Sequence, residues 1–322
     1  MTSASLAART LLTLHFVPGV GQRSLLKLSR HPQFLNTPLT EMGAWLPALR
    51  ARLTPDALQA AGEQAQANLE LARADGAAVV CVLDATYPPL LSETPDPPAF
   101  LFVKGHLRPE QCVAVIGTRE PTPHGAEIAR RATHYLAERG WSIISGLALG
   151  VDAHAHQAAL DTGGHTVAVL AHGLQRVSPR QHAALAGRIL EQGGALVSEY
   201  PYGTGVFPAQ FVKRDRTQAG LSQGVVMVQS GLKGGSLHAS RASIEYGRPL
   251  GVPWPTRQDH DAGADKVQAN LCLLGEPRGA AQLLRCRESH LQRVMAIHSR
   301  DDYPRFEAAL SPRPRAEPAR LF

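Results

Sequence analysis

The sequence contains few of the residues that build metal and disulfide sites. Its 322 residues include four cysteines without a C-x-x-C pair, so the spacing of a zinc knuckle or a disulfide framework is absent. Unbroken apolar runs are short, as in residues 77–83, and fall far below the roughly 20 residues that span a bilayer. The first residues lack the pattern of a cleaved leader. We therefore expect a cytoplasmic protein with no membrane segment and no bound metal.

Several ligand-binding motifs are absent as well. No G-x-x-x-x-G-K-[ST] run occurs, and Gly146 and Gly150 do not fit G-x-G-x-x-G with an acidic residue about 20 positions later, which argues against a P-loop ATPase and a conventional NAD site. His154 and His156 lie two apart on a predicted helix, about 200° around its axis, so they cannot share a metal. No catalytic triad is recognisable. We expect no cofactor and no enzymatic activity.

Lysine is scarce, and arginine dominates the basic residues. Of 33 basic residues only five are lysines, and the formal net charge is +6. Arginine suits phosphate groups because its planar fork donates paired hydrogen bonds. A GC-rich genome would produce the same bias. The charge therefore permits an anionic partner without identifying one.

The chain divides into a helical front and a longer strand-rich part. Residues 6–73 have a helical pattern throughout, with Thr54 and Pro55 opening a helix that has one apolar face. We expect a small all-helical domain over residues 1–75. The turn Pro18-Gly19-Val20-Gly21 has two readings, a phosphate-binding hairpin or a helix–helix turn that packs this domain.

After Gly76, short aliphatic runs alternate with helical stretches. This alternation is typical of an α/β fold with a doubly wound, mostly parallel sheet and helices on both faces. We assign it to residues 76–290. The expected strands are residues 79–83, 100–103, 113–116, 142–144, 166–170, 195–197, 225–228 and 250–252.

The remaining residues, 291–322, are expected to form a C-terminal tail. The last dozen hold three prolines and three arginines without periodicity, which favours disorder. The segment is too short and too rich in proline for a winged helix.

Glycine is concentrated just after the expected strands, where ligands bind in a doubly wound sheet. Glycine lets backbone N–H groups approach an anion, and a helix N-terminus adds partial positive charge. A single such turn could equally serve strand–helix packing, but several at successive strand ends favour a phosphate site. The candidates are Gly117, Thr118, Ser145, Gly146, Gly173, Lys233, Gly234, Gly235 and Ser236.

Basic and aromatic residues lie beside these turns. Arg119 follows one strand directly, and Lys213, Arg214 and Arg216 cluster in a later helical stretch. If the fold brings them together, four cations would rim the glycine turns and follow a phosphate backbone. Neighbouring aromatic residues either stack on bases or pack in the core; they are Tyr202, Phe207 and Phe211.

The ordered motifs resemble those of the DNA-processing protein A family, also called DprA or Smf. The similar stretches include VAVIGTR at 113–119, SGLALGVDAHAHQAAL at 145–160, GHTVAVLAHG at 164–173, SEYP at 198–201 and GGSLHASRA at 234–242. They extend over about residues 76–274. The helical front resembles the family's SAM-like or helix-hairpin-helix domain more loosely.

This resemblance implies an extended Rossmann-like domain that binds single-stranded DNA in a basic pocket. It also implies a homodimer that protects incoming DNA and loads the RecA recombinase during natural transformation. The family's G-[ST]-R position falls on Gly117, Thr118 and Arg119. Its basic run falls on residues 213–216, where Asp215 replaces the family's asparagine and places a negative charge beside the expected contacts.

A rival interpretation on the same superfold is a nucleotide-ligand sensor or a phosphoribohydrolase. Such hydrolases resemble lysine decarboxylases and carry an acid directly after a glycine turn. Here the turn at Gly234 is followed by no carboxylate until Glu245, more than two helical turns away. DNA binding is therefore the favoured function.

Overall fold

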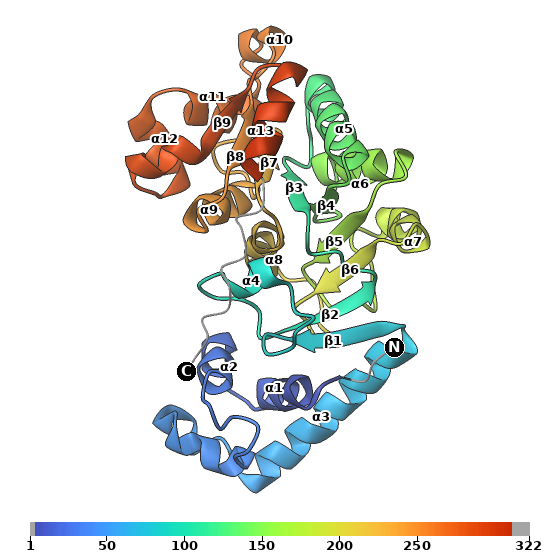
Figure 1. Cartoon of the computed structure of the whole chain (residues 1–322), viewed down its shortest axis with the longest axis vertical. Coiled ribbons are helices and arrows are strands. Elements are labelled where there is room, and N and C mark those ends of the chain that lie inside the picture. The colour runs from blue at the N-terminus through green and yellow to red at the C-terminus, as the bar shows by residue number, and fades with distance from the viewer. Residues whose placement is uncertain (1–3, 311–322) are drawn as a thin grey trace.

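The computed structural model describes residues 4–310, which are organised around one large sheet. Its nine strands lie in the order β1-β2-β6-β5-β4-β3-β7-β8-β9 (Figure 1). The seven strands from β6 to β9 run parallel, and β1 and β2 extend the β6 edge as antiparallel neighbours. The expected doubly wound, mostly parallel sheet is confirmed.

The element bounds follow the chain in order. The strands are β1 (Ala77–Cys81), β2 (Phe100–Gly105), β3 (Cys112–Ile116), β4 (Ser142–Ser145), β5 (Thr166–Leu170), β6 (Ala195–Ser198), β7 (Val225–Met227), β8 (Leu250–Pro253) and β9 (Val294–Ile297). The α-helices are α1 (Leu6–Phe16), α2 (Gln22–Ser29), α3 (Pro55–Ala74), α4 (Pro89–Ser92), α5 (Pro123–Glu138), α6 (Val151–Asp161), α7 (Ala183–Glu191), α8 (Pro208–Leu221), α9 (Leu237–Glu245), α10 (Arg257–Asp261), α11 (Gln268–Leu274), α12 (Pro277–Leu284) and α13 (Tyr303–Leu310). Short 3-10 turns lie between them at Leu39–Ala44, Pro47–Leu49, Arg180–His182, Asp265–Val267, Glu288–Arg293 and Arg300–Asp302. Within residues 4–310, no helix is both long and apolar enough to cross a membrane.

Helices cover both faces of the sheet (Figure 1). Alternate residues of β3 enter different cores: Val113 and Val115 pack with α5, α6 and α13, whereas Ala114 and Ile116 pack with α8, α9 and α12. This follows from the strand period of two, which sends successive side chains to opposite faces. Both faces are covered, so β3 and β5 are buried at every position and consist mainly of aliphatic residues.

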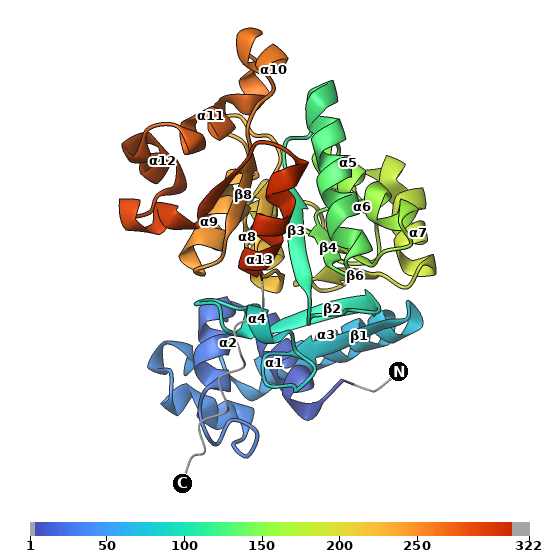
Figure 2. The ribbon, with the colours of Figure 1, turned by 45° about the horizontal axis from the view of Figure 1, so that its top comes forward.

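The helical front packs directly on the β1–β2 edge, as Figure 2 shows. Its long helix α3 begins at a Thr54 cap, whose hydroxyl accepts a hydrogen bond from Ala57 N–H at 3.3 Å, and Pro55 fits the first helical position. One continuous core joins Leu11 of α1 to Phe100 and Phe102 of β2. The residues before Ala77 are thus helical, but they share their core with the sheet. Their assignment to a SAM-like domain stays a prediction.

The expected boundary at residue 290 is wrong. Residues 294–297 form β9, which pairs in parallel with β8 through Leu250↔Val294 to Pro253↔Ile297. Helix α13 follows and buries Phe306 and Leu310 against α5. The apolar run V-M-A-I is short and lies between arginine-rich stretches, so its pattern alone did not indicate a strand. The tail expected over residues 311–322 lies outside the described residues.

Candidate functional site

The sheet reverses its order of growth between β3 and β7. From β3 the chain adds β4, β5 and β6 in one direction, and α8 then carries it back to β7 on the other side of β3. The two strands are held in register by Ile116↔Met227. Loops that leave neighbouring strands in opposite directions open a crevice at their carboxyl ends, which is where ligands bind in doubly wound folds.

A cavity of about 480 Å³ lies at this switch point. Its walls come from the turn after β3, the start of α6, one face of α8, the turn before α9 and the 3-10 turn at Asp265–Val267. The lining residues are Ile116, Gly117, Thr118, Arg119, Glu120, Ala148, Asp152, Phe211, Arg214, Asp215, Gln218, Gly234, Gly235, Ser236, Ala239 and Lys266.

Glycine is required where the β3 and β4 turns meet. A Cβ added at Gly117 would lie 2.6 Å from Val151 Cγ2. Gly150 has φ +74°, a left-handed backbone that favours glycine, and a Cβ there would lie 2.5 Å from Thr118 O. These glycines therefore have a packing role, and that packing also places the Thr118 and Arg119 backbone at the rim.

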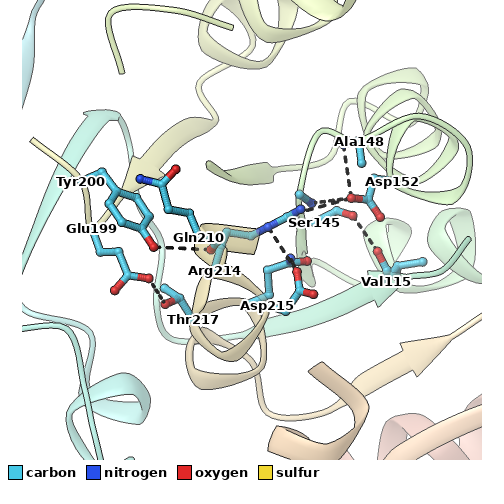
Figure 3. Close-up of polar contacts among 12 residues, drawn as sticks. Val115, Ser145, Ala148, Asp152, Glu199, Tyr200, Gln210, Arg214, Asp215 and Thr217 are labelled. Atoms are coloured by element: carbon cyan, nitrogen blue, oxygen red, sulfur yellow. Dashed lines mark hydrogen bonds and ion pairs between the residues drawn. The ribbon is translucent and has the colours of Figure 1, made fainter. Parts of the chain in front are cut away.

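Arg214 is a buried cation held between two carboxylates (Figure 3). Its side chain is only 5% exposed, with Nε 3.2 Å from Asp215 Oδ1 and Nη1 3.7 Å from Asp152 Oδ2. Asp152 also accepts hydrogen bonds from Gly146 N–H at 3.1 Å and Ala148 N–H at 3.3 Å. A Cβ at Gly146 would collide with Arg214 Nη1. Arg214 is thus a structural centre of the cavity wall and is not available as an exposed phosphate contact.

Burial dominates the titration of both carboxylates. Desolvation raises the pKa of Asp215 to about 7 against the lowering effect of Arg214, and the charge of Asp152 raises it further. Desolvation also raises the pKa of Asp152, although Arg214 and the two backbone donors oppose it. Asp215 therefore becomes protonated as the pH falls below about 7, and the cavity wall loses negative charge.

The exposed rim carries the accessible positive charge. Arg119 is exposed, forms no ion pair with any described residue, and lies with its guanidinium 5.3 Å from the Phe211 ring centroid. The Arg214 guanidinium lies 5.7 Å from the same centroid. Phe211 therefore forms an aromatic wall between an exposed and a buried arginine. Lys266 was not predicted from the sequence, and its Nζ is 3.1 Å from Glu120 Oε2.

Of the four cations expected around the glycine turns, Arg119 and the buried Arg214 line the cavity. Lys213 is exposed and lies near His15. Burial lowers the pKa of His15, and the positive charge of Lys213 lowers it further. Arg216 forms an ion pair with Asp96. Neither Lys213 nor Arg216 lines the cavity.

Of the predicted turn residues, Gly117, Thr118, Gly234, Gly235 and Ser236 line the cavity. Lys233 is exposed beside them without lining it. Ser145 is buried and donates to Val115 O at 2.7 Å, and Gly173 N–H donates to Thr204 O at 3.2 Å. These two residues, like Gly146, support the loops behind the wall.

The aromatic residues divide between core and surface. Tyr202 is buried, packs against Phe102 and donates its hydroxyl to Asp75 Oδ2 at 2.9 Å, which confirms its core alternative. Phe207 is exposed, and Phe211 lines the cavity. Within residues 4–310 no group of His, Cys, Asp and Glu is arranged to hold a metal ion.

A G-x-S-x-G run at residues 220–224 does not form a nucleophile elbow. That elbow needs an exposed serine on a strand-to-helix turn. Here Ser222 lies on the helix-to-strand connection between α8 and β7, is fully buried, and donates its hydroxyl to Gln218 O at 2.9 Å.

Comparisons with known proteins identify the family to which the chain is similar. The family model described as DNA recombination-mediator protein A matches residues 78–275. Protein Smf of Escherichia coli (strain K12) is 41% identical over 195 residues, which cover 59% of this chain and 52% of that protein. DNA processing protein DprA of Bacillus subtilis (strain 168) is 36% identical over 181 residues, which cover 55% of this chain and 61% of that protein. The match thus spans about half to three fifths of these relatives' length.

Two solved structures share the fold. DprA from Streptococcus pneumoniae matches with a TM-score of 0.71 and 25% identity, covering 92% of this chain and 97% of that one. DprA from Helicobacter pylori, described for its single-stranded DNA binding mode, matches with a TM-score of 0.57 and 25% identity, covering 73% of this chain and 95% of that one. With its switch-point cavity, its ordered motifs and a family match over more than half of its length, the chain belongs to the DNA recombination-mediator protein A family.

Proposed function

We propose that the switch-point cavity and its rim bind single-stranded DNA. The observation that carries this proposal is the meeting of two glycine-rich turns, Gly117–Arg119 and Gly234–Ser236, around one cavity with an exposed arginine at its mouth. Backbone N–H groups of such turns bind phosphate oxygens, and Phe211 offers a ring on which a base stacks. The single-stranded DNA binding mode described for the Helicobacter pylori relative supports this assignment.

Arg119 is the principal phosphate contact in this proposal, with Lys233 and Lys266 as further cations near the turns. Arg214 acts as a positioning residue, because Asp152 and Asp215 hold its guanidinium inside the wall. The site therefore presents fewer exposed cations than the sequence suggested, and each exposed cation should contribute a distinct share of the salt dependence.

The test is fluorescence anisotropy of labelled oligo-dT at several salt concentrations. Arg119→Ala should weaken binding and make the slope of log K against log salt shallower by about 0.7, the value for one phosphate on a single strand. Arg257→Ala is the matched control, because Arg257 is 95% exposed on α10 and does not line the cavity. Equal salt slopes for wild type and Arg119→Ala would overturn the proposal.

We further propose the partners that the family resemblance implies. The protein acts in the cytoplasm as a homodimer that protects incoming single strands and loads a RecA recombinase in natural transformation. Light scattering should give twice the mass of 34.5 kDa. RecA ATPase activity on single strands coated with a single-strand-binding protein should rise when the protein is added. A monomeric mass would contradict the homodimer. An unchanged ATPase rate would contradict RecA loading.

The role proposed is non-enzymatic. The two carboxylates in the cavity are engaged with Arg214, and the glycine turn before α9 continues into Leu237, His238 and Ala239 without an acid. Incubation with nucleoside monophosphates should therefore release no free base by chromatography. A released base would favour the phosphoribohydrolase alternative, which needs an acid beside the sugar.

A further inference from the structure

The cavity wall contains hydrogen-bonding atoms that the protein itself does not satisfy. Gln218 is 2% exposed and lines the cavity, yet its Oε1 has no hydrogen-bond partner among the described residues. Its Nε2 donates to Asp215 Oδ1 at 3.1 Å. Arg214 Nε lies 3.2 Å from the same oxygen. Both contacts of Asp215 thus use Oδ1, and Oδ2 is left for a ligand.

These groups require a ligand that donates hydrogen bonds. A carboxylate and an amide oxygen are both acceptors, and leaving a buried acceptor unpaired costs free energy. The phosphate oxygens of DNA also only accept, so they cannot satisfy Asp215 or Gln218. In single-stranded DNA the useful donors are the N–H groups on the base edges. The wall formed by Asp215 and Gln218 is therefore suited to a base rather than to the backbone.

The order of groups along α8 distinguishes between the bases. Asp215 and Gln218 lie three residues apart on α8, so they share one helix face, and both line the cavity with acceptor oxygens. Arg214 Nη1 lies 3.7 Å from Asp152 Oδ2, in the space that a Cβ at Gly146 would fill, and takes no part in this set. Guanine carries two adjacent donors on one edge, N1–H and the N2 amino group. The corresponding edge of adenine, cytosine or thymine has a single donor group.

We propose that this cavity recognises a guanine base of the bound single strand. The guanine N1–H and N2 amino group donate to Asp215 and Gln218, and the ring stacks on Phe211. The inference rests on the proposed DNA binding and adds a base preference to it. Asp215 is central because an asparagine at this position would present an amide N–H₂ group where guanine presents its own donors.

The test uses wild-type protein and three oligonucleotides of equal length at pH 8 and fixed salt. One is oligo-dT, the second has one central guanine, and the third has inosine there, which keeps N1–H but lacks the N2 amino group. We expect the guanine strand to bind about tenfold more tightly than oligo-dT, as for a bidentate base contact, with inosine between them. Equal affinities for all three strands would overturn the inference.

Two variants locate the preference. Asp215→Asn and Gln218→Leu should each reduce the ratio of guanine to thymine affinity to about one. Asp261→Asn should keep the ratio, because Asp261 is exposed on α10 outside the cavity. A ratio that both cavity variants leave unchanged contradicts the assignment. Because the inosine comparison uses wild-type protein, a variant that fails to fold does not decide the outcome.

Failure of DNA binding itself would be recognised separately. If no oligonucleotide binds, the proposed function is wrong, and calorimetry with dGMP and dTMP then tests the base site alone. A preference for dGMP supports the base assignment, and equal or absent binding of both nucleotides overturns it.

Discussion

At the scale of single residues, the absence of a side chain at Gly146 determines where Arg214 lies. The guanidinium occupies the space that a Cβ would fill, beside Asp152 Oδ2. Gly146→Ala should therefore lower the free energy of unfolding by about 1–3 kcal/mol, the usual range for overpacking a buried site. Urea denaturation measures this loss.

Gly62→Ala provides the matched control. Gly62 lies within α3, and a Cβ there meets nothing within 4 Å. Alanine should stabilise this helix position by about 0.5–1 kcal/mol. If both substitutions changed the free energy of unfolding in the same direction, crowding around Arg214 would not explain the need for glycine at position 146.

The ionisation of Asp215 makes stability depend on pH. Its folded-state pKa of about 7 is above its ordinary value of 3.8, so the unfolded chain releases this proton at lower pH than the folded chain. The stabilisation from Asp215 is full below pH 3.8 and is lost as the pH rises through about 7. The free energy of unfolding of Asp215→Asn should therefore rise relative to that of wild type as the pH increases from about 4 to about 7. Above pH 7 the difference should stay constant.

Urea denaturation of both proteins at pH 5, 6, 7 and 8 tests this dependence. Asp261→Asn is the control, because Asp261 is exposed on α10 and does not line the cavity. A pH-independent difference for Asp215→Asn would mean that burial does not perturb Asp215.

At the scale of elements, the geometry of α8 explains which of the expected site residues line the cavity. Phe211, Arg214, Asp215 and Gln218 follow the spacing i, i+3, i+4 and i+7, so they share the face that lines the cavity. Arg214 and Arg216 lie about 200° apart around the helix. A cluster along the sequence is therefore not a cluster in space, and helical periodicity alone could have separated Arg216 from the site.

The same helix gives a prediction about the excluded cations. Arg216→Ala removes an ion pair with Asp96 on the α4 side of the molecule and should leave the salt slope of oligo-dT binding as steep as in wild type, whereas Arg119→Ala should reduce it. Anisotropy titrations of the two variants side by side measure the difference. A larger reduction for Arg216→Ala than for Arg119→Ala would place the DNA on the other face of α8.

The sequence supported some parts of the fold better than others. The central strands are mainly aliphatic and followed by glycine, so their place and the turns after β3 and β7 were predictable. Gln218 and Lys266 were missed because a lone glutamine or lysine gives no pattern. Their importance comes from loops and helices that meet only in the folded chain. Strand β9 was missed because four apolar residues carry no periodic signal.

At the scale of the whole molecule, the helical front and the sheet should unfold together. Leu11 and Leu14 of α1 lie in the same buried core as Val79, Phe100 and Phe102 of the β1–β2 edge. Separation would expose both sides of this core, at roughly 25 cal/mol for each Å² of apolar surface. The boundary near residue 75 therefore marks a change of secondary structure and not the end of a cooperative unit.

Tryptophan fluorescence tests this cooperativity in the full chain. Trp45 stacks on His31 at a ring-centroid distance of 3.6 Å in the helical front. Trp141 is buried in the core that α5, α6 and α13 form against the sheet. Trp254 is 42% exposed and can be replaced by phenylalanine at little cost. In the variants that retain only Trp45 or only Trp141, the fluorescence midpoint in urea should coincide with the circular-dichroism midpoint of the same variant. Leu11→Ala should lower both midpoints together, for a cost of about 2–5 kcal/mol. Two separate midpoints, with only that of Trp45 responding to Leu11→Ala, would show that the front folds independently of the sheet.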